Sequence, residues 1–288
     1  MTQLHEPFKA TYVSDQSLAP ALFLQTWINK WPELSVGFTT RHGGESPIPF
    51  QSMNVSLRVS DDVQAVMNNR NTIEGYTGLG EHSWTCAEQV HGTQIRNVKQ
   101  EHRGAGRERI DTELEQADAL LTNESGIMLV SFYADCVPLY FFDSRHRIIG
   151  LAHAGWKGTY GRISKHVIDE MATTYGTSVT DLHCAVGPSI GGCCYEVDRN
   201  LIEHFATQFP HMERFLTRSD DQAMLDLKAL NISILLEAGV PAEHITSSLY
   251  CTSCSDNGNL FFSHRRDQGK TGRMISWIGL KKNEPDMS

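Results

Sequence analysis

The apolar positions of this chain recur with two periods, one typical of strands and one typical of helices. Three β-rich apolar runs lie in the middle of the chain, at residues 127–133, 139–143 and 148–153, with short breaks between them. Such runs are typical of central strands that are buried on both faces. Further strands are predicted at residues 35–40, on either side of a loop within 84–98, and at 182–186, 247–250, 260–263 and 273–278.

Helical spacing is clearest in residues 163–175, where Ile163, Val167, Ile168 and Met171 fall on one face. Residues 61–79 have the same spacing, with Asp61 or Asp62 placed to cap the helix. The remaining predicted segments are a helix from Asp198 to Phe209, a helix over 223–238 stopped by Gly239 and Pro241, and an exposed charged loop over 99–116.

Strands and helices are interspersed along the chain, without an internal repeat or a Pro/Ser-rich linker. This order predicts an α/β (α+β) sandwich, in which mixed β-sheets are flanked by helices. The length of 288 residues is ample for a sizeable hydrophobic core. We therefore expect residues 1–288 to form a single large domain.

Charge and apolar content narrow the classes of partner. The formal net charge is -9, from 25 basic and 34 acidic residues, which disfavours nucleic acid or an anionic membrane as a ligand. The most apolar stretch, residues 127–142, is too short to span a bilayer and contains Asp135. The N-terminus lacks the pattern of a signal peptide, and seven cysteines suit a reducing compartment. We expect a cytoplasmic protein.

Three soft ligands stand beside residues that shape loops and strand ends. They are His91 in QVHGT, Cys136 in YADCVPL and His153 in AHAGWKG, each followed closely by glycine or proline. Two imidazoles and one thiolate suit zinc, and three protein ligands leave a fourth position open, as in catalytic sites. We predict that this triad binds a catalytic metal, with Asp135 as a candidate to orient a metal-bound histidine.

Other chemistries use the same residue types. The separations of 45 and 17 residues match no short metal signature. A zinc deaminase requires P-C-x-x-C, whereas the C-x-x-C from Cys251 to Cys254 follows Tyr250. Cys136 could also act as a nucleophile with His153 or His91 as its base, and sequence alone does not separate this mechanism from metal binding.

Basic residues beside glycines indicate a small-anion site. Arg41 in TTRHGG, Lys157 in GWKG and Arg265 in FFSHRRD are the candidates for binding phosphate. A second metal site from Cys193, Cys194, Cys251 and Cys254 is conceivable, but adjacent cysteines rarely bind one ion together, and we expect buried free thiols instead.

Taken in order, several motifs resemble those of one known family over about residues 35 to 280. The motifs are TTRHGG, NNR, QVHGT, ADALLT, ADCVPLYFFD, AHAGWKGT, GPSIGGCCYEV, and CTSC with FFSHRRDQGKTGRM. They are similar to those of the purine nucleoside phosphorylases once called multicopper polyphenol oxidases or laccase-domain proteins, which include peptidoglycan editing factor-like members. The resemblance implies an α/β sandwich and a zinc site at His91, Cys136 and His153.

The resemblance also implies activities and partners. These are phosphorolysis of adenosine, inosine, guanosine and S-methyl-5'-thioadenosine, and deamination of adenosine, by a monomer or homodimer that binds purine nucleosides and phosphate. The alternatives are an amidase-like hydrolase that edits peptidoglycan precursors and a copper-dependent polyphenol oxidase, with Cu²⁺ in place of Zn²⁺. Thirteen histidines, none of them two apart, argue against a multicopper cluster. Arg58 occupies a position where relatives often have histidine, which could alter substrate preference.

Overall fold

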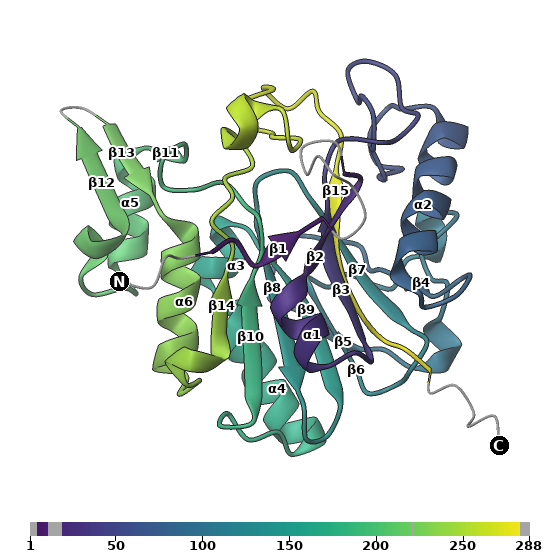
Figure 1. Ribbon diagram of the computed structural model, residues 1–288. Coiled ribbons are helices and arrows are strands. Elements are labelled where there is room, and N and C mark those ends of the chain that lie inside the picture. The colour runs from purple at the N-terminus through teal and green to yellow at the C-terminus, as the bar shows by residue number, and fades with distance from the viewer. Residues whose placement is uncertain (1–4, 11–18, 220–221, 283–288) are drawn as a thin grey trace.

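The computed structural model describes residues 5–10, 19–219 and 222–282. Within these residues, most strands belong to two six-stranded sheets (Figure 1). The first sheet has the order β1 (Phe8–Lys9), β2 (Ala21–Leu24), β3 (Leu34–Thr39), β15 (Met274–Leu280), β7 (Met128–Tyr133) and β4 (Trp84–Thr85). The second has the order β14 (Ile245–Ser247), β10 (Leu182–Val186), β8 (Val137–Asp143), β9 (Ile148–Ala154), β6 (Ala119–Thr122) and β5 (Ile95–Asn97).

Both sheets are mixed. Their central neighbours pair antiparallel, while β4 with β7, β10 with β14 and β5 with β6 pair parallel. A small third sheet consists of β11 (Glu196–Val197), β13 (Gln222–Leu225) and β12 (Leu216–Ser219).

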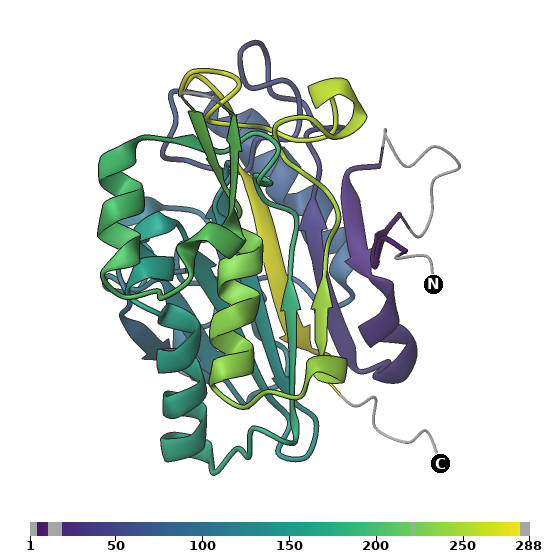
Figure 2. The ribbon, with the colours of Figure 1, turned by 90° about the vertical axis from the view of Figure 1, so that its left-hand side faces the viewer.

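Helices cover the outer faces of the two large sheets, except for one helix whose Trp27 packs into the core between them. The helices are α1 (Gln25–Lys30), α2 (Val63–Thr77), α3 (Trp156–Tyr160), α4 (Ile163–Tyr175), α5 (Arg199–Ala206) and α6 (Leu227–Glu237). Helix α2 packs on the first sheet, where Ile73 joins a cluster with Val130 and Trp277. Helices α4 and α6 lie across the second sheet and cover the face that is turned toward the viewer in Figure 2.

The continuous apolar runs reflect burial on both faces of the central strands. Along β8, Tyr140 and Phe142 point into the core that the two sheets share, together with Phe38 of β3. Phe141 points the other way, into the core beneath the helices. Because successive side chains of a strand alternate between faces, a strand between two cores needs apolar residues at every position. The predicted class, mixed sheets flanked by helices, is confirmed.

Several predicted elements have the observed bounds, and others differ. The helix over 163–175 and the strand over 182–186 are confirmed. The helix predicted over 223–238 begins only at Leu227, because the Asp226 carboxylate caps it by accepting the Ala229 N–H, and residues 222–225 form β13. The helix after Asp198 ends at Ala206 instead of Phe209.

One further prediction was wrong, and another holds only in part. Residues 260–263 are irregular, because their backbone turns into the 263–271 loop, which the Asp267 carboxylate holds together by accepting from the Thr271 hydroxyl. The charged segment 99–116 is partly buried, since Arg107 forms an ion pair of 2.8 Å with Glu74 of α2. In the described part of the chain, no helix is both long and apolar enough to cross a membrane.

Candidate functional site

The β8–β9 hairpin brings Cys136 and His153 together. Antiparallel pairing sets His153 opposite Pro138 and Ala154 opposite Val137, so Cys136, directly before β8, lies beside the end of β9. His91 joins them from the loop between β4 and β5, with its backbone at φ 59°. One ligand atom from each of the three side chains lies within 4.8 Å of the others. The structure thus brings the predicted triad together.

A buried carboxylate, that of Asp118, fixes the positions of both histidines. Its Oδ1 lies 2.9 Å from His153 Nδ1, which leaves the opposite ring nitrogen to face the other ligands. The same carboxylate accepts the backbone N–H groups of Val90, His91 and Gly92. One side chain therefore orients one ligand and holds the loop that carries another, as partners of metal ligands commonly do.

Glycine at position 155 leaves room for the close packing of the triad. A Cβ at Gly155 would lie 3.1 Å from Cys136 Sγ and 3.2 Å from His91 Cδ2. Contacts this short would force the ligands apart. The glycine of the GWKG motif therefore makes room for the thiol and the imidazole.

The charges of the triad are coupled. Burial alone would raise the pKa of Cys136, but the neighbouring His153 and His91 lower it to about 6. Burial opposes protonation of His153, whereas the Cys136 thiolate and Asp118 together raise its pKa to about 9. A thiolate and two imidazoles are the donors that zinc prefers, so the residues present fit a metal ion with three protein ligands.

The triad lines a cavity of about 520 Å³, a size suited to a small ligand. Aromatic side chains of Phe132, Trp156 and Tyr195 form part of its wall. Three arginines, Arg58, Arg265 and Arg273, also line it. Aromatic surface together with positive charge suits a ligand that has a planar ring and an anionic partner.

The three arginines are held in different ways. Arg265 donates to the Glu196 carbonyl at 2.7 Å and lies over the Tyr195 ring, and Arg273 donates to the Thr271 and Gly272 carbonyls. Their partners carry no net charge. Arg58, in contrast, is paired with the carboxylate of Glu113. Positive charge for an anion therefore comes mainly from Arg265 and Arg273.

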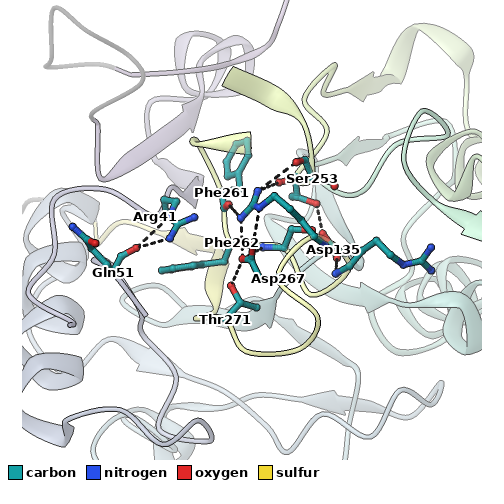
Figure 3. Close-up of polar contacts among 12 residues, drawn as sticks. Arg41, Gln51, Asp135, Ser253, Phe261, Phe262, Asp267 and Thr271 are labelled. Carbon is teal, nitrogen blue, oxygen red and sulfur yellow. Dashed lines mark hydrogen bonds and ion pairs between the residues drawn. The ribbon is translucent and has the colours of Figure 1, made fainter. Parts of the chain in front are cut away.

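The structure does not bring the three predicted phosphate ligands together. Of these three residues, only Arg265 lines the cavity in the described part of the chain. Arg41 donates twice to the Gln51 carbonyl and lies over the Phe262 ring (Figure 3). Lys157 is exposed, with its ammonium 5.6 Å from the Trp156 ring centroid.

Asp135 has a different role from the one expected. It adopts φ 94° and accepts hydrogen bonds from the Thr252 hydroxyl, the Ser263 hydroxyl and the Arg265 N–H (Figure 3). It therefore anchors the C-terminal loops to the end of β7, while Asp118 orients His153. The signal for Asp118 was an aspartate directly before an apolar strand, where a buried charge needs partners.

The four cysteines considered for a second metal site also lie close together. Ligand atoms of Cys193, Cys194, Cys251 and Cys254 lie within 4.8 Å of one another. Cys193 and Cys254 are exposed and Cys194 is half-buried, so the expectation of buried thiols holds only for Cys251. All seven cysteines lie in the described residues and are free.

The chain is similar to known proteins along most of its length. Residues 35–281 match the family model described as multi-copper polyphenol oxidoreductase laccase. Purine nucleoside phosphorylase YlmD of Geobacillus stearothermophilus is 43% identical over 248 residues, which are 85% of this chain and 90% of that protein. The Bacillus subtilis protein of the same name is 38% identical over 286 residues, covering 96% and 99%. The crystal structure of YlmD from G. stearothermophilus superimposes with a TM-score of 0.89 at 38% identity, covering 96% of this chain and all of that one.

Proposed function

Since this chain belongs to the multi-copper polyphenol oxidoreductase laccase family, we propose that it is a zinc-dependent purine nucleoside phosphorylase. Its substrates in this proposal are adenosine, inosine, guanosine and S-methyl-5'-thioadenosine, and it also deaminates adenosine. The names of the two YlmD relatives support the phosphorylase activity. We further propose that it acts in the cytoplasm as a monomer or homodimer.

One observation carries the proposal: His91, Cys136 and His153 present their ligand atoms together on the wall of a cavity that also holds arginines and aromatic rings. A zinc ion bound by these residues would supply Lewis-acid chemistry to a group in its open position. Asp118 keeps His153 in the tautomer that turns Nε2 toward the other ligands. Because His153 and Asp118 are both buried, the interaction between them is strengthened.

The cavity wall contains groups that suit each of the two substrates. Arg265 and Arg273 attract phosphate, and the rings of Trp156 and Tyr195 offer flat surface to the purine. In phosphorolysis, a phosphate oxygen bonds to the anomeric carbon while the bond from that carbon to the purine nitrogen breaks, and the purine takes up a proton. Holding both substrates in one cavity lowers the entropic cost of this step. Arg41 and Lys157 lie outside the cavity wall and are not part of this proposal.

Alanine at a single ligand is the direct test. We predict that Cys136→Ala and His153→Ala each abolish phosphate-dependent turnover of adenosine, a loss of more than about 100-fold, because two protein ligands hold zinc poorly. His166→Ala, on the exposed face of α4, is the matched control and should leave turnover unchanged. Turnover is measured as release of free base, with circular dichroism to show that each variant is folded. Full activity in both ligand variants contradicts the metal mechanism.

A cysteine hydrolase is the second candidate, because Cys136, His153 and Asp118 also form a nucleophile, a base and an orienting carboxylate. The substrate in that case is an amide bond in a peptidoglycan precursor that contains serine. Comparing kcat/KM for adenosine with phosphate and for a serine-containing muropeptide distinguishes the two. Hydrolysis of the muropeptide by metal-free protein, with no nucleoside turnover, favours the hydrolase.

Copper-dependent oxidation of phenols is less well supported, despite the family's description. Multicopper oxidases need many imidazoles, whereas the two ligand clusters in the described residues together contain two histidines. Oxygen uptake with a phenol by the copper-loaded protein is the corresponding measurement.

A further inference from the structure

Two loops far apart in sequence bring four thiols to one point beside the cavity. Cys193 and Cys194 follow β10, and Cys251 and Cys254 follow β14, its parallel neighbour. Hydrogen bonding between the strands continues into the loops, where Thr252 N donates to the Ser189 carbonyl at 3.0 Å. The sheet therefore fixes the separation of the two cysteine pairs. Cysteine is among the most frequently buried residues, so two exposed free cysteines side by side need a physical explanation.

The distances between the sulfur atoms suit one metal ion. A tetrahedral zinc site with Zn–S bonds of about 2.3 Å places its sulfur atoms about 3.8 Å apart. Here the Sγ atoms of Cys193 and Cys254 are 3.6 Å apart, and all four sulfur atoms lie within 4.8 Å of one another. The spacing of Cys251 and Cys254 is the C-x-x-C of structural zinc sites.

The adjacent cysteines can face the same point because the chain turns there. The carbonyl of Gly191 accepts both the Cys194 and the Tyr195 N–H, at 2.9 and 3.0 Å, so residues 191–195 form one tight turn. A Cβ at Gly191 would lie 3.2 Å from Cys193 Sγ and 3.7 Å from Cys251 Sγ. In an extended strand, neighbouring side chains would point to opposite faces. The turn removes the objection that adjacent cysteines rarely share an ion.

Donors and cations around the cluster suit negatively charged sulfur. Gly191 N–H donates to Cys251 Sγ at 3.2 Å. The Lys228 ammonium donates to the Tyr250 carbonyl at 2.8 Å and lies near enough to Cys251 and Cys193 to attract their thiolates. Arg266 donates to the Thr252 and Ser253 carbonyls and so fixes the turn between Cys251 and Cys254 (Figure 3). Four thiolates and one Zn²⁺ carry a net negative charge, which the Lys228 ammonium helps to stabilise, whereas Arg266 is paired with Asp267 and serves to hold the turn.

We propose that Cys193, Cys194, Cys251 and Cys254 bind a structural zinc ion, separate from the His91, Cys136 and His153 site. The ion would join two loops that reach the cavity. Tyr195, next to Cys194, lines the wall of the cavity. Thr252, next to Cys251, donates to Asp135, which precedes Cys136. The second site thereby stabilises one side of the first.

Metal counting on selective variants tests the proposal. Full-length wild-type protein, Cys136→Ser, and the double variant Cys193→Ser/Cys254→Ser are purified anaerobically, and zinc is measured by elemental analysis. We expect about two zinc ions per wild-type chain and about one in each variant, because each variant loses one site. Circular dichroism shows whether each variant is folded.

Cobalt gives a readout that does not depend on folding of the double variant. In Cys136→Ser the four cysteines are intact, so Co²⁺ added to the chelator-treated protein should give the intense sulfur-to-cobalt charge-transfer absorption of a tetrathiolate site. Absence of that absorption, or of zinc in Cys136→Ser, overturns the proposal. A Cys193 to Cys254 disulfide in the anaerobic protein, detected by mass after alkylation, also overturns it. Failure of nucleoside turnover would bear on the proposed function alone, because these readouts use metal content and absorption.

Discussion

At the scale of single residues, Asp118 supports two of the three metal ligands, a role that its position in the sequence does not indicate. It orients His153 and accepts three backbone N–H groups of the His91 loop. We predict that Asp118→Asn lowers zinc affinity about 10- to 100-fold, because an amide accepts fewer of these hydrogen bonds and carries no charge. Affinity is measured by competition with a chromophoric chelator. Asp169→Asn, on the exposed face of α4, is the control, and equal affinity of the two variants contradicts the role of Asp118.

His183 makes stability depend on pH. Burial, together with His244 and Lys30, lowers the pKa of His183 to about 4, and its ring lies 4.0 Å from that of His244. His183 takes up a proton near pH 6.5 in the unfolded chain and only near pH 4 in the folded chain. The free energy of unfolding should therefore fall as the pH drops through that window, and the part due to His183 is fully present above it.

Urea denaturation from pH 4 to pH 7 measures this effect. His183→Gln should show a flatter dependence than the wild type, while His166→Gln, which alters an exposed imidazole, should match the wild type. An unchanged slope in His183→Gln would show that another group is responsible.

The metal ligands could be predicted from residue type, whereas the residues that support the site could not. His91, Cys136 and His153 could be found because thiol and imidazole are the preferred donors of zinc. Arg41 looked equally suited to phosphate, but it does not line the cavity. Whether a cation reaches the cavity depends on the course of the loop that carries it, which the sequence does not specify.

At the scale of elements, capping residues determine where helices begin. Asp62 accepts the Ala65 N–H at 2.8 Å at the start of α2. We predict that Asp62→Ala lowers the free energy of unfolding by about 1 kcal/mol, since it leaves that donor without its partner. Asp62→Asn retains an acceptor and should cost only a few tenths of that amount. Urea denaturation measures both, and an equal loss in the two variants would show that the charge matters more than the cap.

Elements with an internal period were predicted well, and elements that depend on partners were not. Helix α4 repeats its apolar face every three to four residues, so both ends could be located. Strand β13 precedes α6 with only Asp226 between them, and four residues of strand look like an extension of the helix. The pairing of β13 with β11 and β12 distinguishes them, and pairing is a long-range property.

At the scale of the whole molecule, buried tyrosine hydroxyls link the two large sheets. Tyr140 of β8 donates to the Gly37 carbonyl of β3 at 2.8 Å, through the core that the sheets share. We predict that Tyr140→Phe lowers the free energy of unfolding by about 1 to 2 kcal/mol, because the ring is kept and only this buried hydrogen bond is lost. The slope of the urea transition should not change. Tyr76→Phe, on an exposed part of α2, is the control, and an unchanged midpoint in Tyr140→Phe would contradict the prediction.

The β8–β9 hairpin has a consequence for tracing this site through distant sequences. Strand register places Cys136 beside His153, and the four residues from Ser144 to Arg147 only reverse the chain at the far end of the hairpin. Insertions or deletions in that turn would change the interval between the two ligands without moving either of them. A fixed-interval pattern would therefore miss members with longer turns. A search that anchors each ligand to its own strand and lets the interval vary would retain them.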